Sequence, residues 1–397
     1  MTIDRIFKAS VVLKDIVRKT SIVRASGIAP QCELYIKPEN LQNTGSFKLR
    51  GSGFKIAMLS EEEKKRGVIA CSAGNHAQGV ALAASKCGIS SLICLPDSAP
   101  ISKIEATKGY GAKVCLVPGC YDDAYKRALE LRDSEGYTLV HPFDDEDVIA
   151  GQGTIGLEIV NELDDVDAVI VPIGGGGLIA GVAFAIKSLR PNIKVYGVQA
   201  AGAPSMYNSI KNGRIEALDS VSTIADGIAV KRPGDLTYAL IKEYVDDIAT
   251  VTDDEISSAI LALIEKQKMI AEGAGAVSVA AAMFDKFPIA GKKVVCLVSG
   301  GNIDVNILSR VITRGLMKSG RTTSLRIELI DKPGQLQEVS RIIAECGANV
   351  TSVHHEHESS TTDVNGCYLR IAMETRNYEH VQQIQQALRD AGFKLIV

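Results

Sequence analysis

The sequence lacks a surplus of charge of either sign. Its 397 residues contain 44 lysines and arginines against 47 aspartates and glutamates, a formal net charge of −3 at pH 7. Binding to nucleic acid or to an anionic membrane surface normally requires a basic patch, so we expect neither as a partner. Small molecules are the better candidates for what this chain binds.

The sequence also lacks a disulfide framework and a secretory signal. Its nine cysteines are an odd number without a Cys-x-x-Cys pair, and Cys71 and Cys296 lie in apolar, strand-like runs. Charges interrupt the first eight residues, so no continuous apolar segment begins the chain. These features predict reduced thiols and a cytoplasmic location.

No stretch is interpreted as a membrane span. Residues 168–186 carry no charge and are long enough to cross a bilayer. However, four consecutive glycines follow Pro172 in the middle of this stretch, and they make a poor helix. A buried strand, a turn and a buried helix explain the stretch better.

Short β-branched runs alternate with longer helical patterns through most of the chain, and a glycine- or proline-marked turn follows each run. This alternation is typical of βαβ units with a parallel sheet, hence an α/β fold. Ligands of such folds bind at the carboxyl ends of the strands. The runs expected to form strands are residues 33–36, 67–70, 91–95, 113–117, 168–173, 194–199 and 293–298.

The pattern changes near residue 320. A polar, glycine-containing linker at residues 318–323 separates residues 1–320 from a second domain, residues 323–397. The order βαββαβ is expected there, which is the ferredoxin-like arrangement. Its predicted elements are strands 324–330, 349–357 and 367–374, helices 335–346 and 378–391, and a short last strand.

Lys48 lies between two apolar residues, with glycines close on either side, in the segment Asn-Thr-Gly-Ser-Phe-Lys-Leu-Arg-Gly of residues 43–51. This setting suggests a buried lysine. Burial lowers the pKa of an ammonium group and makes the amine a nucleophile that can form a Schiff base. An ordinary surface lysine is the alternative.

Three strand-to-turn junctions carry polar or glycine-rich residues. In residues 68–79, the Ser72 hydroxyl, the Asn75 amide and the N–H groups of a helix start could receive a carboxylate. In residues 294–304, Ser299 ends a buried strand and would point to the same edge of the sheet. An ordinary helix cap is the alternative at both junctions.

The remaining junction, in residues 169–181, has the glycines to fold N–H groups around a phosphate at a helix N-terminus. The spacing Gly175-x-Gly177-x-x-Ala180 also matches a dinucleotide fingerprint. Gln199 occupies the end of the next strand, where a ribose-binding acid is expected. A single phosphate therefore fits better than a dinucleotide.

Three histidines fall on one predicted strand, and no metal is expected there. Alternation places His354 on one face and His355 with His357 on the other, which leaves at most two ligands together. An exposed or interfacial strand is the preferred interpretation.

Two groups of acidic residues are interpreted as structural. The run at residues 144–147 is expected to form a solvated loop before a helix that follows Gly153. Asp226 and Glu272 could bind a cation or close a site, but turn-capping is the simpler interpretation.

Taken together, these motifs resemble those of the fold-type II pyridoxal-phosphate enzymes, and within them the L-threonine ammonia-lyases (threonine dehydratases). The resemblance covers about 300 residues, and it rests on residues 44–51, 72–76, 174–178 and 299–302 in this order. It implies a two-subdomain body like the tryptophan synthase β chain, with parallel sheets and a smaller subdomain at about residues 51–147. The tail, with its turn at residues 331–334, resembles a single ACT regulatory domain.

The resemblance implies specific residue roles around pyridoxal 5'-phosphate. Lys48 would hold the cofactor through its amine and then act as the catalytic base. The substrate carboxylate would be bound by Ser72, Ala73, Gly74, Asn75 and His76. The cofactor would be bound by Lys48, Phe47, Asn75, Gly174, Gly175, Gly176, Gly177, Leu178 and Ser299, the last facing the pyridine nitrogen.

A neutral hydroxyl at Ser299 would leave the pyridine ring a weaker electron sink than an aspartate would. Expulsion of a β-hydroxyl is then favoured over transamination, giving 2-oxobutanoate and ammonia from L-threonine, with minor activity on L-serine. A serine ammonia-lyase and a serine racemase share this site and are not distinguished by spacing. A catalytically silent amino-acid sensor is a further alternative, from another class.

The tail is expected to bind a regulatory ligand. Isoleucine or valine is expected by resemblance, in an enzyme of isoleucine biosynthesis. AMP is the alternative, because catabolic relatives that break down threonine respond to nucleotides. A lone ACT unit also favours at least a homodimer, and a homotetramer is possible.

Overall fold

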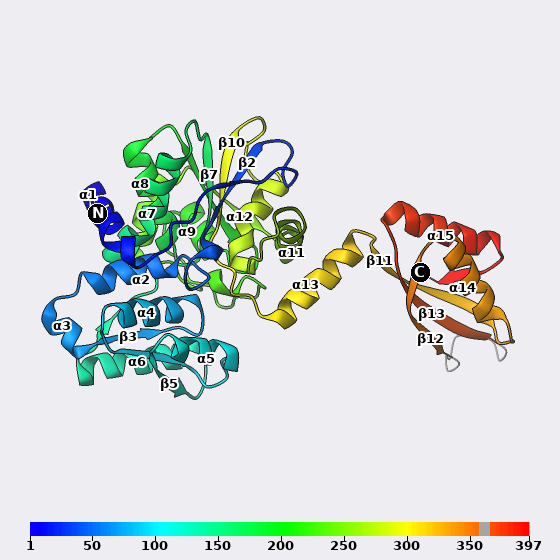
Figure 1. Ribbon diagram of the computed structural model, residues 1–397, viewed down its shortest axis with the longest axis horizontal. Helices are drawn as coiled ribbons and strands as arrows, with labels where there is room; N and C mark the ends of the chain where they lie inside the picture. Colours follow the sequence, from blue (N-terminus) through cyan, green and yellow to red (C-terminus); the bar gives the residue numbers. More distant parts are fainter. Residues whose placement is uncertain (357–365, 397) are drawn as a thin grey trace. The chain divides into compact units, whose positions relative to one another are not determined.

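The computed structural model describes residues 1–356 and 366–396. The chain divides into two compact units, Met1–Asp304 and Val305–Val397, each of which is described by itself (Figure 1). Among the described residues, no helix combines the length and apolarity needed to cross a bilayer.

The larger sheet of the first unit has six strands in the order β1-β2-β10-β7-β8-β9. All neighbours are parallel except β1 and β2. The central strands are buried nearly throughout, because they read as continuous apolar runs. The bounds are β1 Val23–Arg24, β2 Glu33–Pro38, β7 Ala168–Pro172, β8 Lys194–Ala200, β9 Asp247–Val251 and β10 Lys293–Val298.

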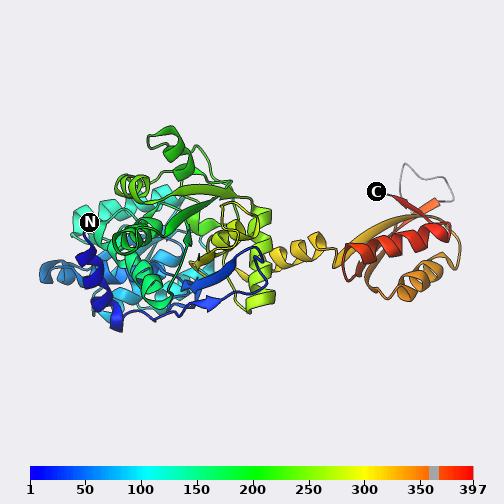
Figure 2. The same ribbon diagram turned by 90° about the horizontal axis from the view of Figure 1, so that it is seen from above.

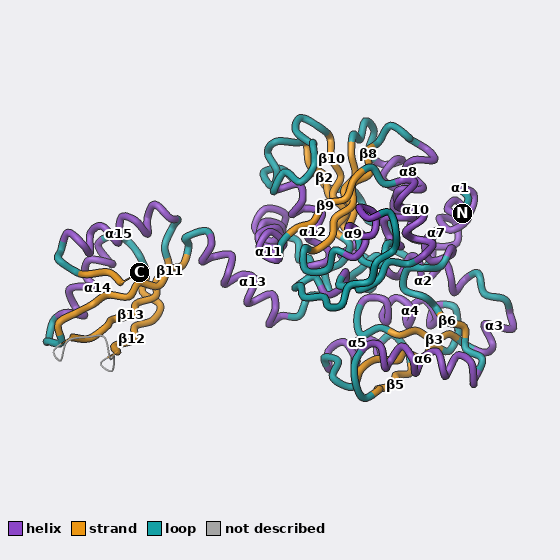
Figure 3. The backbone as a smooth tube through the Cα atoms, turned by 180° about the vertical axis from the view of Figure 1, so that it is seen from behind, coloured by secondary structure: helices purple, strands orange, loops and turns teal. Residues whose placement is uncertain are grey.

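Helices cover both faces of this sheet, with α7 and α8 on one side and α11 and α12 on the other (Figures 1 and 3). The helices of this subdomain are α1 Ile3–Val12, α2 Lys48–Ala57, α7 Glu146–Glu162, α8 Gly177–Leu189, α9 Ser205–Asn212, α10 Asp235–Tyr244, α11 Asp253–Ala262 and α12 Gly273–Met283. Short 3-10 or π turns occupy Leu13–Asp15, Glu39–Leu41, Asp226–Ile228 and Leu263–Gln267.

The smaller sheet is wholly parallel, with the order β5-β4-β3-β6. Along β3, Val68 and Ala70 join the core beneath α4, whereas Ile69 and Cys71 join the core beneath α6. Helix α2 packs against both α4 and α7 and so connects the two subdomains. The bounds are α3 Glu61–Arg66, β3 Val68–Cys71, α4 Asn75–Lys86, β4 Ser91–Pro96, α5 Ile101–Gly109, β5 Lys113–Val117, α6 Tyr121–Glu135 and β6 Thr138–Leu139.

Every strand expected in the first unit is present, and the uncharged stretch at residues 168–186 is the strand β7, a turn and most of α8. Strands β1, β6 and β9 were not expected. The prediction for the acidic run was wrong, because α7 begins inside it at Glu146. The Asp145 carboxylate accepts hydrogen bonds from the N–H groups of Asp147 and Val148, so it caps the helix.

The second unit has the expected βαββαβ order, preceded by the helix α13. Its antiparallel sheet has the order β12-β13-β11-β14. The helices α14 and α15 lie against this sheet (Figure 2), and their apolar residues join one core with one of its faces. The bounds are α13 Val305–Lys318, β11 Thr322–Ile330, α14 Gln335–Glu345, β12 Asn349–Glu356, β13 Gly366–Glu374, α15 Tyr378–Asp390 and β14 Lys394–Ile396. His357, expected on β12, lies outside the described residues.

A buried charge cluster fixes the start of α2. The Arg50 guanidinium donates to both carboxylate oxygens of Glu39 at 2.8 Å and to both of Glu158 at 2.6 and 2.9 Å. Arg50 and Glu39 are both fully buried. Burial alone would raise the pKa of Glu39, but Arg50 more than reverses this and holds it below the ordinary value. The helix that begins with Lys48 is thereby tied to β2 and α7.

Candidate active site

The carboxyl end of β10 meets the start of α2. The Phe47 N–H donates to the Ser299 carbonyl at 3.0 Å, and Ser46 pairs with Gly300 in an isolated β-bridge. Ser299, which directly follows β10, therefore lies beside the residue that precedes Lys48. Two of the motifs separated by about 250 residues in the sequence are neighbours in space.

Lys48 is half-buried, but its ammonium group lies deep in the protein. The ammonium donates a hydrogen bond to the Pro142 carbonyl at 2.9 Å. Burial lowers the pKa of Lys48 to about 8, and the nearby Glu272 carboxylate offsets part of this shift. Near pH 8 a large share of the amine is therefore neutral and nucleophilic, unlike that of a surface lysine.

The loop that receives Lys48 also contacts the glycine motif. Phe143 follows the acceptor Pro142, and its ring lies so close to Gly175 that a Cβ there would be 2.4 Å from Phe143 Cδ1. A Cβ on Gly177 would lie 2.8 Å from the Phe143 carbonyl oxygen. Only glycine fits at these two positions, and the contact brings Lys48 and the glycine loop to one place.

The glycine loop has backbone N–H groups for which the described residues provide no hydrogen-bond acceptor. The N–H groups of Gly174 to Leu178 donate no hydrogen bond to any residue that the structure describes, although all but Gly174 are buried. Buried N–H groups are otherwise almost always paired. They lie at the N-terminus of α8, where the helix dipole favours a negative charge. The arrangement fits a phosphate group.

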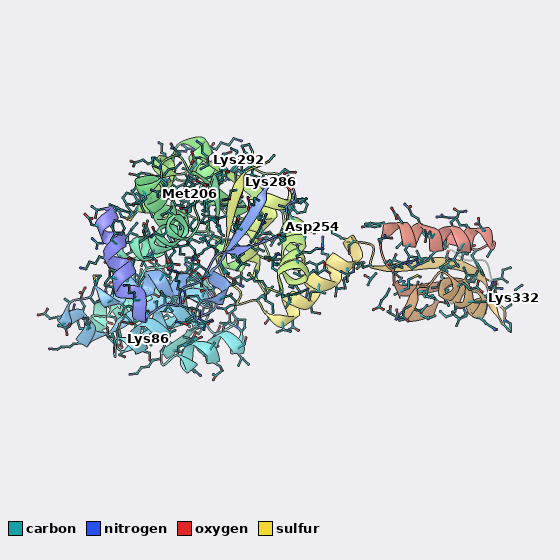
Figure 4. All side chains as sticks on the ribbon, turned by 45° about the horizontal axis from the view of Figure 1, so that its top comes forward. Lys86, Met206, Asp254, Lys286, Lys292 and Lys332 are labelled. Carbon is teal, nitrogen blue, oxygen red and sulfur yellow. The ribbon has the colours of Figure 1, made fainter. Side chains whose placement is uncertain are left out.

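Substitution of Gly176 by alanine is expected to disrupt this loop. Gly176 has φ +102°, and a Cβ would lie 2.8 Å from Thr237 Cβ and 2.9 Å from Met206 Cε; Met206 is labelled in Figure 4. We expect Gly176→Ala to weaken pyridoxal phosphate binding by about 10- to 100-fold, the equivalent of one charge-assisted hydrogen bond. Cofactor titration of the apoprotein measures this.

Gly213→Ala is the matched control. Gly213 also has positive φ, +71°, but no atom lies within 4 Å of its Cβ position. It should cost about 1 kcal/mol of stability from backbone strain and leave cofactor affinity unchanged. Equal losses of affinity in both variants would show that strain, and not the shape of the loop, is responsible.

The loop between β3 and α4 forms a second anion-binding arrangement. The Ser72 hydroxyl accepts a hydrogen bond from the Gly74 N–H at 3.1 Å, and the loop from Ser72 to Asn75 is half-buried, within reach of a ligand. The N–H groups of Asn75 and His76, in the first turn of α4, donate no hydrogen bond to the described residues. These N–H groups could bind a substrate carboxylate, just as the N–H groups at the start of α8 could bind a phosphate.

His76 is buried, and its Nε2 lies 2.8 Å from the Val140 carbonyl oxygen. Burial lowers the pKa of His76 to about 3, and the positive charge of Lys48 adds to the shift, so the ring is neutral. With its Nε2 directed to Val140, His76 offers a substrate carboxylate its backbone N–H. Ala73 and Gly74, which precede it, are half-buried.

Asn75 and Asn302 connect the carboxylate loop to the other motifs. The Asn302 amide donates to the Thr44 carbonyl and to Asn75 Oδ1, both at 2.8 Å. The Asn75 amide donates in turn to the Glu272 carboxylate at 2.7 Å. This chain of hydrogen bonds joins residues from the segments of Lys48, Ser72 and Ser299.

Ser299 is buried, and its hydroxyl donates to the Ala274 carbonyl at 3.3 Å. It therefore presents a neutral group where the strand β10 ends. All four predicted motifs are brought together by the contacts described above, although the sequence places them in separate segments.

Glu272 is the residue that sequence reasoning undervalued. It precedes α12, as expected for a turn, but its carboxylate is buried against Asn75 instead of capping the helix. Burial and, to a smaller extent, the nearby Asp226 carboxylate raise the pKa of Glu272 to about 7. The signal in the sequence was a single acid among small and apolar residues, Ile-Ala-Glu-Gly-Ala-Gly.

This carboxylate should make the stability of the apoprotein depend on pH. Because the folded pKa is about 7, against about 4.3 for an unperturbed glutamate, the folded state binds the extra proton between these values. Stability is therefore lost as pH rises through this window, by at most about 4 kcal/mol. Glu272→Gln should remove this loss; pulse proteolysis in urea at pH 5 and pH 8 measures it. Parallel pH profiles for both proteins would contradict the assignment.

Comparison with known proteins agrees with this geometry. Residues 13–300 match the family described as pyridoxal-phosphate dependent enzyme, and residues 318–391 match the ACT domain. This chain belongs to the pyridoxal-phosphate dependent enzymes. Its cofactor is accordingly pyridoxal phosphate, and the unpaired N–H groups at α8 together with the buried amine of Lys48 fit that group.

Three relatives show how far the similarity extends. L-threonine ammonia-lyase of Thermotoga maritima is 49% identical over 397 residues, which cover 100% of this chain and 99% of the relative. L-threonine dehydratase catabolic TdcB of Escherichia coli K12 is 46% identical over 315 residues, 78% of this chain and 96% of the relative. The solved structure of maize serine racemase has a TM-score of 0.75 at 35% identity, and covers 80% of this chain and 98% of that one.

Proposed function

We propose that this enzyme converts L-threonine to 2-oxobutanoate and ammonia, with minor activity on L-serine. The observation that carries the proposal is the amine of Lys48, with its pKa lowered to about 8, between the glycine loop and the carboxylate loop. The full-length similarity to an L-threonine ammonia-lyase supports the choice of substrate.

Each motif has a role in this proposal. Gly174 to Gly177, with the Leu178 N–H, would hold the cofactor phosphate; Lys48 and Phe47 would contact the cofactor, and Asn75 would hold its ring oxygen. The loop from Ser72 to His76 holds the substrate carboxylate and so orients the substrate. When bound, pyridoxal phosphate supplies an electron-withdrawing group that makes the proton at the substrate Cα acidic.

The reaction is an elimination. The Lys48 amine accepts the proton from Cα, the Cβ–O bond breaks, and the leaving hydroxyl takes up one proton, which balances the proton removed from Cα, and departs as water. The released enamine hydrolyses to 2-oxobutanoate and ammonia. Ser299 would present a neutral hydroxyl to the pyridine nitrogen, which would leave the ring a weak electron sink and so favour loss of the β-hydroxyl over transamination.

The rival functions are those of a serine ammonia-lyase and a serine racemase, the second being the activity named for a protein of the same fold. Turnover of the purified enzyme on L-threonine, L-serine and D-serine separates the three. We expect the highest kcat/KM for L-threonine, with 2-oxobutanoate and ammonia in equal amounts. Absence of keto acid from L-threonine, or D-serine as the main product from L-serine, would overturn the proposal.

For the tail, we propose allosteric control by a small amino acid, isoleucine or valine, with AMP as the alternative effector. Catalysis is assigned to residues 1–320 and regulation to residues 323–397. The match of residues 318–391 to the ACT domain supports this division. The E. coli relative supports it too, because the alignment covers 96% of that protein but only 78% of this chain. The choice of effector would distinguish a role in isoleucine biosynthesis from one in threonine catabolism, and a cytoplasmic homodimer or homotetramer is expected.

Truncation after Lys318 tests the regulatory role. Isoleucine, valine and AMP are titrated against both proteins while threonine turnover is followed. We expect a response in the full chain that is lost in the shortened one. Identical responses would show that the tail is not the sensor.

A further inference from the structure

We propose that Asp331, His355 and Cys367 in the second unit bind a divalent transition metal ion of the zinc class. One ligand atom from each side chain lies within 4.8 Å of the other two. The inference concerns the tail alone and does not rest on the threonine reaction.

The pairing of three strands brings these side chains together. Asp331 directly follows β11, Cys367 is on β13 opposite Leu329 of β11, and His355 on β12 is opposite Leu369 of β13. Residues opposite one another share a face, and so do residues two apart on a strand. Cys367 and His355 are therefore diagonal neighbours on the face that α14 and α15 cover.

The distances are near those of tetrahedral coordination, and the imidazole and the thiol would move slightly apart to reach them. His355 Nε2 lies 3.0 Å from Cys367 Sγ, close enough for the two atoms to share a proton. Ligands at about 2.0–2.3 Å from a tetrahedral zinc ion are about 3.3–3.8 Å apart. Small side-chain rotations would thus admit an ion in place of that proton.

The donor set points to the class of metal. A thiolate, an imidazole and a carboxylate are the three ligand types that zinc takes in proteins. Magnesium and calcium prefer all-oxygen sites, so the sulfur and nitrogen donors disfavour them. No metal was expected on β12, because that strand alone offers at most two histidines on one face. The donors that complete the site, Asp331 and Cys367, come from other segments of the chain.

A fourth coordination position is available. The three ligands line a pocket of about 300 Å³ together with Lys332, Pro333 and other residues of the turn after β11. Figure 4 labels Lys332, which marks this turn at one end of the unit. Three protein ligands with an open position are the arrangement that leaves room for water or an exchangeable ligand. A bound ion would thus present its open position to the pocket.

The test is the metal content of the full-length holoenzyme. The protein is stripped with a chelator, incubated with zinc chloride, desalted and analysed by inductively coupled plasma mass spectrometry. We expect about one zinc ion per chain for the unaltered protein, and less than about one tenth for Cys367→Ser and for His355→Ala. Cobalt replacing zinc should add a cobalt–thiolate absorption band that Cys367→Ser abolishes.

Two controls isolate the site. His354→Ala removes the neighbouring histidine, which pairs with Arg370 on the opposite face, and Cys346→Ser removes a half-buried thiol of the same unit. Both should keep the zinc and the cobalt band. No zinc in the unaltered protein, or the same zinc content in all five proteins, would overturn the proposal. Resistance of residues 323–397 to limited proteolysis, equal in each variant to that of the unaltered protein, shows that the second unit has folded.

Discussion

Lys48→Ala should lower threonine turnover by at least about 10³-fold, because the substitution removes both the amine that holds the cofactor and the base that takes the Cα proton. The absorption of the lysine-bound cofactor should disappear in the same protein. Lys48→Arg should be equally inactive, since a guanidinium keeps the charge but is not a nucleophile at neutral pH. Steady-state assays of 2-oxobutanoate formation give the comparison.

Lys55→Ala is the matched control for this prediction. Lys55 lies on the same helix, and its ammonium pairs with the Asp145 carboxylate at 2.7 Å, away from the Pro142 carbonyl that receives Lys48. It should retain turnover within a few-fold of normal. Normal turnover in Lys48→Ala, or an equal loss in Lys55→Ala, would contradict the assigned role. An amino-acid sensor without activity would show no turnover to lose.

Arg50→Ala should destabilise the first unit by about 3–5 kcal/mol, because it leaves the fully buried Glu39 carboxylate without its cationic partner. The free energy of unfolding can be measured by pulse proteolysis in urea. The protected fragment of the first unit is identified on a gel by its size. The double variant Glu39→Gln with Arg50→Ala should regain part of the loss. A neutral amide leaves no unpaired charge in the interior.

Arg5→Ala provides the comparison for a pair that is not buried. Arg5 also donates two hydrogen bonds to a carboxylate, that of Asp147, but its side chain is 40% exposed. Solvent screens such a pair, so a loss of at most about 1 kcal/mol is expected. Equal effects of the Arg5 and Arg50 substitutions would mean that burial of the charges does not determine their contribution.

Much of the fold could be predicted because the central strands are apolar on both faces. Strands such as β7 and β10 are continuous hydrophobic runs that are soon followed by glycine or serine, so their limits are visible in the sequence. Strand β9, Asp-Ile-Ala-Thr-Val, lies at the sheet edge and is only partly buried. Its short, mixed pattern carries little signal. The acidic run was predicted to be a solvated loop, but Asp145 in this run caps the helix α7.

The candidate site was predictable to the extent that it is built from strand ends. Parallel strands bring their carboxyl ends to one edge, so glycine and serine at those positions were expected to meet. The contacts of Glu272, Pro142 and Asn302 were not predictable, because each depends on how loops pack after the chain has folded. For Asn302, the hydrogen bond to Asn75 joins residues 227 positions apart.

The central claim is that the four strand-end motifs make one pyridoxal-phosphate site around Lys48. Borohydride reduction of the holoenzyme, followed by peptide mass spectrometry, tests it most directly, because reduction fixes the cofactor permanently to the lysine that holds it. The account predicts a pyridoxyl group on the peptide that contains Lys48. A pyridoxyl group on another of the chain's lysines, or on none, would contradict it.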